Sequence, residues 1–173
     1  WTNGNVTITA SGSDSGGSGF YRIKKPDGTY ANSTSATYAV SSNGTYTFVF
    51  YDNAGNSTSK SITISNIDKT APSGSVSANT TSWTKENVTL TATGSDSGGS
   101  GFYRIKKPDG TYANSTSTTY TVSSNGTYTF VFYDNVGNSV SKSITVSNID
   151  KTAPSGSVSA NTTSWTKENV TLT

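Results

Sequence analysis

Residues Ser42 to Ser57 read SNGTYTFVFYDNAGNS, and the stretch returns at Ser124 to Ser139 with valine in place of its one alanine. Its centre predicts a β-strand, because Tyr46, Phe48 and Phe50 alternate with Thr, Val and Tyr at the two-residue period of a pleated backbone. Three aromatic rings on one face indicate that this face of the strand belongs to a hydrophobic core.

Turn sequences bound this strand on both sides. Asn43-Gly44 tolerates positive φ, so the pair predicts a tight turn before the strand. Asp52 to Asn56 predicts a second turn, and Lys60 to Ile64 then returns as the partner strand of a hairpin. Further strands are expected from alternation in residues 6–10, 20–25, 29–31, 37–40 and 75–78.

A repeat of 82 residues organises the whole chain, and Trp1, Trp83 and Trp165 open its successive copies. The first two copies differ at nine positions, mostly by exchanges between residue types that suit strands. Proline and a loss of alternation mark junctions near Asp68 and Asp150. The expected modules are therefore 1–68, which lacks its first strand, 69–150, which is complete, and 151–173, which holds the first strands of a third.

The composition excludes most functional chemistry. Cysteine, histidine and methionine are absent, so the chain has no disulfides, no imidazole bases and no imidazole metal ligands. The 12 basic and 10 acidic residues leave a net charge of +2, which is too small to predict nucleic-acid binding. No stretch is long and apolar enough to insert into a membrane.

The sequence also predicts that the chain is not an enzyme and has no catalytic residues. Its acids, such as Asp14, Asp27 and Asp52, fall in turns or junctions rather than facing each other across strands, as paired catalytic carboxylates would. Serine is abundant, but no histidine or nucleophile elbow is present to activate it.

Several motifs occur in a constant order within the period. They are Trp83-Thr84 ahead of Val88 to Thr91, the loop Asp96 to Gly101, the turn Lys107 to Gly110, the strand Gly126 to Phe130, the turn Asp134 to Asn138 and the junction Ile149 to Pro154. Together they resemble the bacterial immunoglobulin-like (Ig-like) repeats found in tandem in surface and secreted proteins. The resemblance covers the whole period. It implies an all-β fold, with tandem Ig-like antiparallel β-sandwiches in a linear array outside the cell, and by itself it implies no ligand.

The resemblance gives Tyr46 a specific expected role. In an Ig-type sandwich a corner tyrosine at this place ties the preceding connection to the backbone through its hydroxyl. The alternative is an ordinary core tyrosine.

An Ig-type fold also implies a metal site between modules. The chain enters such a sandwich at the end where two of its loops meet, so Asp68 should lie near Asp96 from one loop and near Asp134, Asn135 and Asn138 from the other. Their oxygens suit calcium, which takes six to eight oxygen ligands. Two alternatives remain: the second loop is also a good hairpin turn by itself, and Lys69 would be able to pair with the carboxylates.

The expected function is structural: an extracellular rod, stalk or fibre of tandem modules on a bacterial surface. One alternative is an adhesin that binds glycans or wall polymers, because Tyr21, Tyr30 and Tyr51 suit sugar stacking and Arg22 and Lys24 suit anions. Another is a set of spacer modules in a secreted enzyme.

The expected partners are neighbouring identical modules. Because the copies are nearly identical, residues 155–173 should fit the edge of any module that lacks its first strand. This predicts self-association of the chain into a fibre.

Overall fold

A computed structural model describes residues 1–172, and its secondary structure there is all β with antiparallel sheets, which confirms the all-β part of the predicted fold class. The strands of residues 1–68 are β1 Val6–Ser11, β2 Phe20–Lys24, β3 Tyr30–Ala31, β4 Ser35–Val40, β5 Gly44–Asp52 and β6 Ser57–Ile64. The next strands are β7 Ser73–Ala78, β8 Val88–Ser95, β9 Phe102–Lys106, β10 Tyr112–Ala113, β11 Ser117–Val122, β12 Gly126–Asp134 and β13 Ser139–Val146. No helix that would be able to cross a membrane occurs in the described part of the chain.

The second module, residues 69–150, contains two antiparallel sheets. One has the order β10-β9-β12-β13 and the other the order β11-β8-β7. Both sheets contribute to one core, in which Leu90, Ile105, Phe130 and Phe132 are fully buried. Strand β7 pairs with β8 from Ser73↔Ser95 to Ala78↔Leu90 and also packs against β13. The first and last strands of this module therefore lie side by side.

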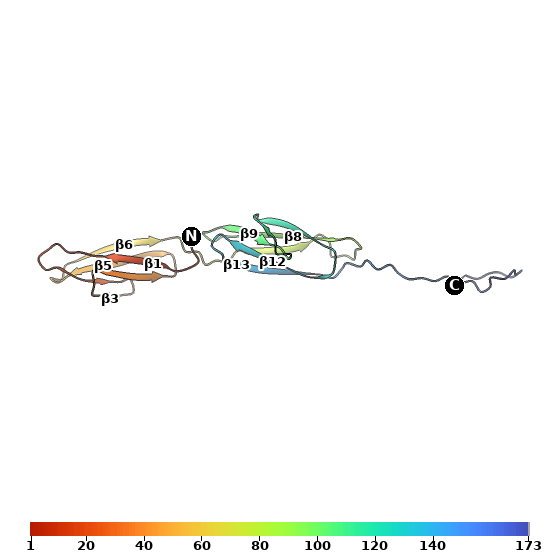
Figure 1. The fold of residues 1–173 in the computed structure, drawn as a ribbon, viewed down its shortest axis with the longest axis horizontal. Coiled ribbons are helices and arrows are strands. Elements are labelled where there is room, and N and C mark those ends of the chain that lie inside the picture. Colours follow the sequence, from red (N-terminus) through yellow and green to blue (C-terminus); the bar gives the residue numbers. More distant parts are fainter. Residues whose placement is uncertain (173) are drawn as a thin grey trace.

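The first module, residues 1–68, repeats this arrangement without a counterpart of β7. Its sheets are β3-β2-β5-β6 and β1-β4, and its core includes Ile8, Ile23, Phe48 and Ile67. The two modules follow one another along the long axis of the molecule, and the N-terminus lies between them (Figure 1). Residues beyond 150 leave the far end of the second module as an extended tail (Figure 1).

The hairpin predicted from Ser42 to Ile64 is present, and its counterpart occurs in the second module as β12 and β13. Strands β5 and β6 pair from Gly44↔Ile64 to Tyr51↔Ser57, and Gly55 has the positive φ of 93° that the turn between them requires. The corner tyrosine is confirmed, because the hydroxyl of Tyr46 donates to the carbonyl of Ser42 at 2.7 Å. Its equivalent Tyr128 makes the same bond to Ser124 at 2.7 Å.

Asn43 has a role that the sequence analysis missed. We expected Asn43-Gly44 to form a turn with positive φ, but neither residue has one, so that prediction is wrong. Asn43 instead accepts a hydrogen bond from the N–H of Ile67 at 2.9 Å and donates to its carbonyl at 2.8 Å. Asn125 holds Ile149 in the same way. The asparagine thus fixes the chain where it leaves each module.

Tyr21 also departs from simple alternation. The pairing of β2 with β5 shifts register between Phe20 and Arg22, which is a β-bulge. Tyr21 is therefore exposed although Ile23, two residues later, is completely buried. The bulge recurs in the second module, where β12 shifts against β9 between Tyr133 and Asp134.

Candidate metal centre

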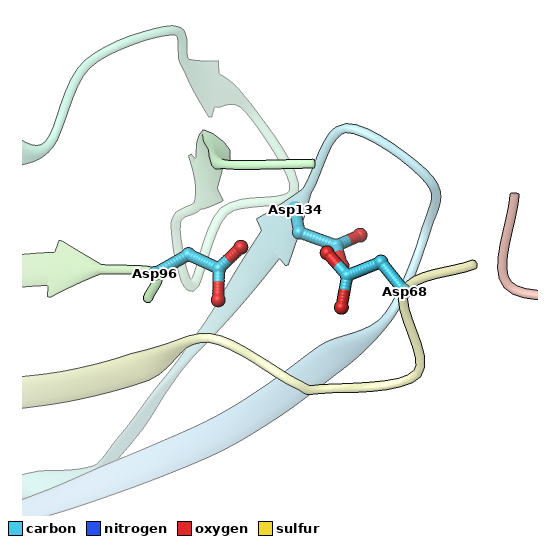
Figure 2. A group of neighbouring side chains, drawn as sticks. All are labelled: Asp68, Asp96 and Asp134. Carbon is cyan, nitrogen blue, oxygen red and sulfur yellow. The ribbon is translucent and has the colours of Figure 1, made fainter. Parts of the chain in front are cut away.

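Three carboxylates meet at the junction of the two modules. They belong to Asp68 in the connection to β7, Asp96 just after β8, and Asp134 at the end of β12. An oxygen of each lies within 4.8 Å of an oxygen of the others, and Figure 2 shows all three side chains pointing toward one another. The topology causes this meeting, because the two loops and the incoming connection share one end of the second module.

Asp68 is held in place by backbone groups of two elements. The N–H of Thr70 donates to its Oδ1 at 3.0 Å, and the N–H of Ser100 donates to its Oδ2 at 2.8 Å. The side chain and backbone of Ser100, followed by Thr70, lower the pKa of Asp68 below its usual value. The Ser100 hydroxyl has no hydrogen-bond partner in this geometry, so the backbone donors are the firmer cause. Asp68 is therefore a buried carboxylate that stays ionised.

Asp134 is organised by the turn that follows it. Its Oδ1 accepts from the N–H groups of Val136 at 3.0 Å and Asn138 at 2.7 Å, and its Oδ2 accepts from the side chain of Asn138 at 2.7 Å. The Asn138 amide also donates to the carbonyl of Asp68 at 3.0 Å. Asn138 therefore joins the second module's last turn to the connection that enters from the first module.

Asp96 has an oxygen available for a further ligand. Its Oδ1 accepts from the N–H of Gly98 at 2.9 Å, whereas its Oδ2 is buried without a hydrogen-bond partner. A buried carboxylate oxygen without a partner is costly, and a cation between the three carboxylates would satisfy it. The donor set contains only oxygen, which suits a hard cation.

The other predicted participants lie elsewhere. Asn135 donates to the carbonyls of Ser100 at 2.7 Å and Gly101 at 3.1 Å, so its amide clamps two loops together instead of facing the carboxylates. Lys69 donates to Asn5 at 3.3 Å, on the side of the first module. The alternative in which Lys69 neutralises the carboxylates therefore does not hold in this geometry.

The first module contains an incomplete version of the same site. Asp14 and Asp52 are the equivalents of Asp96 and Asp134, and they line an open pocket together with Asn56. The side-chain hydrogen bond from Asn56 is the largest cause that lowers the pKa of Asp52. Among residues 1–172, none occupies the place that Asp68 takes in the second module, so two carboxylates are present here instead of three.

Trp1 adds an apolar contact to the junction, which the sequence analysis did not predict. A Cβ built on Gly99 would lie 1.9 Å from Cη2 of Trp1, so the ring rests directly on the glycine backbone. Thr2 also forms a parallel β-bridge with Ile67, which ties the N-terminal segment to the connection. In the sequence, the one sign of this contact is the tryptophan that opens each copy of the repeat.

No protein-family model matches the chain, and no curated protein matches it either.

Proposed function

We propose that this chain is part of an extracellular structural rod, built from tandem Ig-like β-sandwich modules and stiffened at each junction by calcium. The observation that carries the proposal is the junction itself, where the connection between the modules is buried and bonded rather than free. Asp68 is only 3% exposed, and it contacts both Ser100 and Asn138 of the following module. A flexible linker would not need such contacts.

Sequence and shape also support the proposal. The motifs resemble bacterial Ig-like repeats, which occur in surface and secreted proteins, and this resemblance supports an extracellular location. The modules lie end to end, and the N-terminus lies at the junction between them (Figure 1). Each further copy of an 82-residue repeat would then add length to the rod and leave its local contacts unchanged.

Calcium fits the carboxylates of Asp68, Asp96 and Asp134 better than magnesium does. Magnesium prefers to keep several waters, whereas calcium accepts many protein oxygens at flexible angles. The side chains of Asp68 and Asp134 are nearly inaccessible to water, at 3% and 1% exposure. When bound, the cation would offset the negative charge of the three adjacent carboxylates.

We expect calcium to raise the melting temperature of the second module and Asp96→Asn to weaken its binding by about tenfold or more, because affinity follows the number of charged ligands. The substitution is nearly isosteric and leaves Oδ1 able to accept from Gly98. Titration calorimetry and thermal melts with calcium and with chelator would measure both effects. The experiment is run at protein concentrations where the chain is monomeric.

Asp14→Asn is the matched control for this experiment. It changes the equivalent carboxylate of the first module, which has no counterpart of Asp68, and it should leave the calcium affinity of the junction unchanged. Melting temperatures that do not respond to calcium in the unmodified chain would remove calcium from the proposal. Equal losses in both variants would show that calcium binds outside the junction.

If the modules form a rigid rod, Gly99→Ala should loosen the junction between them. The added Cβ would displace the ring of Trp1, so the modules should adopt a wider range of angles. Solution X-ray scattering should then show a shorter mean maximum dimension, and the fluorescence of Trp1 should shift to longer wavelength in a background of Trp83→Phe and Trp165→Phe.

Gly17→Ala is the control, because the equivalent glycine of the first module has no atom within 4 Å of its added Cβ. Scattering from the unmodified chain that fits freely jointed modules would contradict the rod.

The adhesin alternative rests on the exposed tyrosines. The Arg22 guanidinium lies 3.9 Å from the ring centre of Tyr30, and it also lies over Tyr21 at 4.8 Å and Tyr51 at 5.5 Å. Arg104 repeats this cluster in the second module. Cation–π packing already uses these ring faces, which favours a structural role over sugar stacking. A binding screen with glycans and anionic wall polymers distinguishes the two functions.

A further inference from the structure

Asp68 is bonded to both modules at once. Its backbone N–H donates to the carbonyl of Thr2 in the first module at 2.8 Å, and its carboxylate accepts from the N–H of Ser100 in the second module at 2.8 Å. The preceding residue, Ile67, is held by Asn43 of the first module. The chain therefore passes from one module to the other within this single residue.

The connection that follows is short. Residues 69–72 lead directly into β7, which begins at Ser73. The side chain of Asn138 donates to the carbonyl of Asp68 at 3.0 Å and to that of Thr70 at 3.3 Å. Few hydrogen bonds thus hold the connection on the second module, and the carboxylate of Asp68 makes one of them.

That carboxylate also belongs to a cluster of like charges. Asp68, Asp96 and Asp134 approach one another within 4.8 Å, and their side chains point toward one another (Figure 2). Lys69 does not offset them, because its amino group contacts Asn5 instead. Without a cation, the three ionised groups therefore repel one another in a site where little water screens them.

Two buried oxygens in this region lack a hydrogen-bond partner among residues 1–172. They are Oδ2 of Asp96 and the hydroxyl of Ser100. Ser100 also binds the carboxylate of Asp68 through its N–H, so both oxygens border the cluster. Buried oxygens without partners are costly, and calcium binds oxygen ligands, so these two atoms point to a cation independently of the charges.

Asp68 is the member of the cluster that is free to leave. Asp134 is bonded within its own turn by Asn138, and Asp96 accepts from Gly98 of its own loop. Both therefore stay with the second module, whereas Asp68 comes from the connection. Movement of the connection would relieve the repulsion without disturbing either loop.

We propose that calcium controls whether this junction is closed or open, an inference that rests on the proposed calcium site. With the cation bound, Asp68 stays docked on the second module and residues 69–72 are protected. Without it, Asp68 leaves Ser100, and the connection becomes flexible and accessible to proteases. The exposed Lys69 then marks the point at which the rod is cut. Calcium would thereby determine both the stiffness of the rod and its resistance to cleavage.

The size of the effect follows from linkage. A ligand that binds only the closed form lowers the open population by the factor 1 + [L]/Kd, which is about 100 at a free concentration of 100 times Kd. The open form keeps Asp96 and Asp134 and so retains some affinity. The open population should therefore fall by at least about tenfold under these conditions.

The first test is digestion of the unmodified chain with a lysine-specific endoproteinase, in chelator and in calcium. We expect cutting after Lys69 in chelator and cutting at least about tenfold slower in calcium, because cleavage follows the open population when opening is fast. Lys85 is the internal reference: it is also exposed, but it lies between β7 and β8, away from the junction. Cutting after Lys85 should not depend on calcium, and mass spectrometry identifies the fragments.

Gly98→Ala tests the docking of Asp68 directly. The added Cβ would lie 2.7 Å from both carboxylate oxygens of Asp68, so this variant should be cut rapidly after Lys69 even in calcium. Gly16→Ala is the matched control in the first module. The atoms nearest its added Cβ belong to the exposed Asp14, so its protection by calcium should equal that of the unmodified chain.

Amide hydrogen exchange tests the same opening without a substitution. The N–H of Ser100 donates to the carboxylate of Asp68, so it should exchange at least about tenfold faster in chelator than in calcium. The N–H of Asp68 donates to Thr2 of the first module, and it should exchange at the same rate in both conditions.

Calorimetry in parallel separates this inference from the calcium site itself. If the chain binds calcium but is cut after Lys69 at equal rates with and without it, calcium does not control the junction, although the site stands. Equal protection of Gly98→Ala and the unmodified chain, or exchange of the Ser100 N–H that ignores calcium, would overturn the inference in the same way. A chain that binds no calcium would remove both the site and the inference.

Discussion

Phe130→Ala should lower the free energy of unfolding of the second module by about 3–5 kcal/mol. The ring is fully buried, and it meets Tyr120 edge to face with centroids 6.3 Å apart. Removing it leaves a cavity at the centre of the core, with both sheets fixed around it. Urea titration that resolves the two modules should show the transition of the second module move and that of the first stay in place.

Thr121→Ala is the control for Phe130→Ala. Position 121 is exposed, and the first module already has alanine at the equivalent position 39. We expect Thr121→Ala to change the free energy of unfolding by no more than about 0.5 kcal/mol. If Phe130→Ala lowers the free energy of unfolding of the second module by less than about 1 kcal/mol, the ring does not belong to the core as described.

Gly74→Val is expected to destabilise the second module by about 1–3 kcal/mol, because overpacking forces a buried side chain from its rotamer. The added Cβ would lie 2.5 Å from Cδ2 and Cε2 of Phe132, a ring with no exposed surface and no open space to enter. The change suits a strand by propensity, so a loss of stability would come from packing alone. Thermal and urea unfolding measure it.

The same substitution at Gly156 is the matched comparison. The two glycines occupy the same position in identical segments, one packed and one in the tail. At concentrations where the chain is monomeric, Gly156→Val should leave both unfolding transitions unchanged. Equal destabilisation by the two substitutions would mean that β7 does not cover Phe132 as described.

The strands could be predicted because their signal is local. Alternation along Tyr46, Phe48 and Phe50 follows from the pleat, and repetition of the pattern in a second copy made it more certain. The bulge beside Tyr21 was not predictable in the same way, because it depends on the register of a strand 30 residues away. Asn43 was misinterpreted for a related reason: its partner Ile67 is 24 residues distant, and the sequence Asn-Gly also suits a turn.

The candidate site likewise has one part that the sequence predicts and one part that it does not. Asp68, Asp96 and Asp134 lie together as predicted, since their meeting depends only on which loops share one end of the module. Which amides face them depends on hydrogen bonds across that end. Asn135 donates to Ser100 and Gly101, a preference that spacing alone does not encode.

The position of β7 beside β13 determines how the second module would respond to a pulling force. The chain enters this module through β7 and leaves it through β13, at opposite ends of the long axis (Figure 1). Tension along the axis would therefore drag the two strands past each other. Because the bonds of an antiparallel ladder lie across the strands, the six residue pairs of β7 with β8 would share the load and break together rather than one after another. Such shear loading would let a module of modest thermal stability resist sudden stretching.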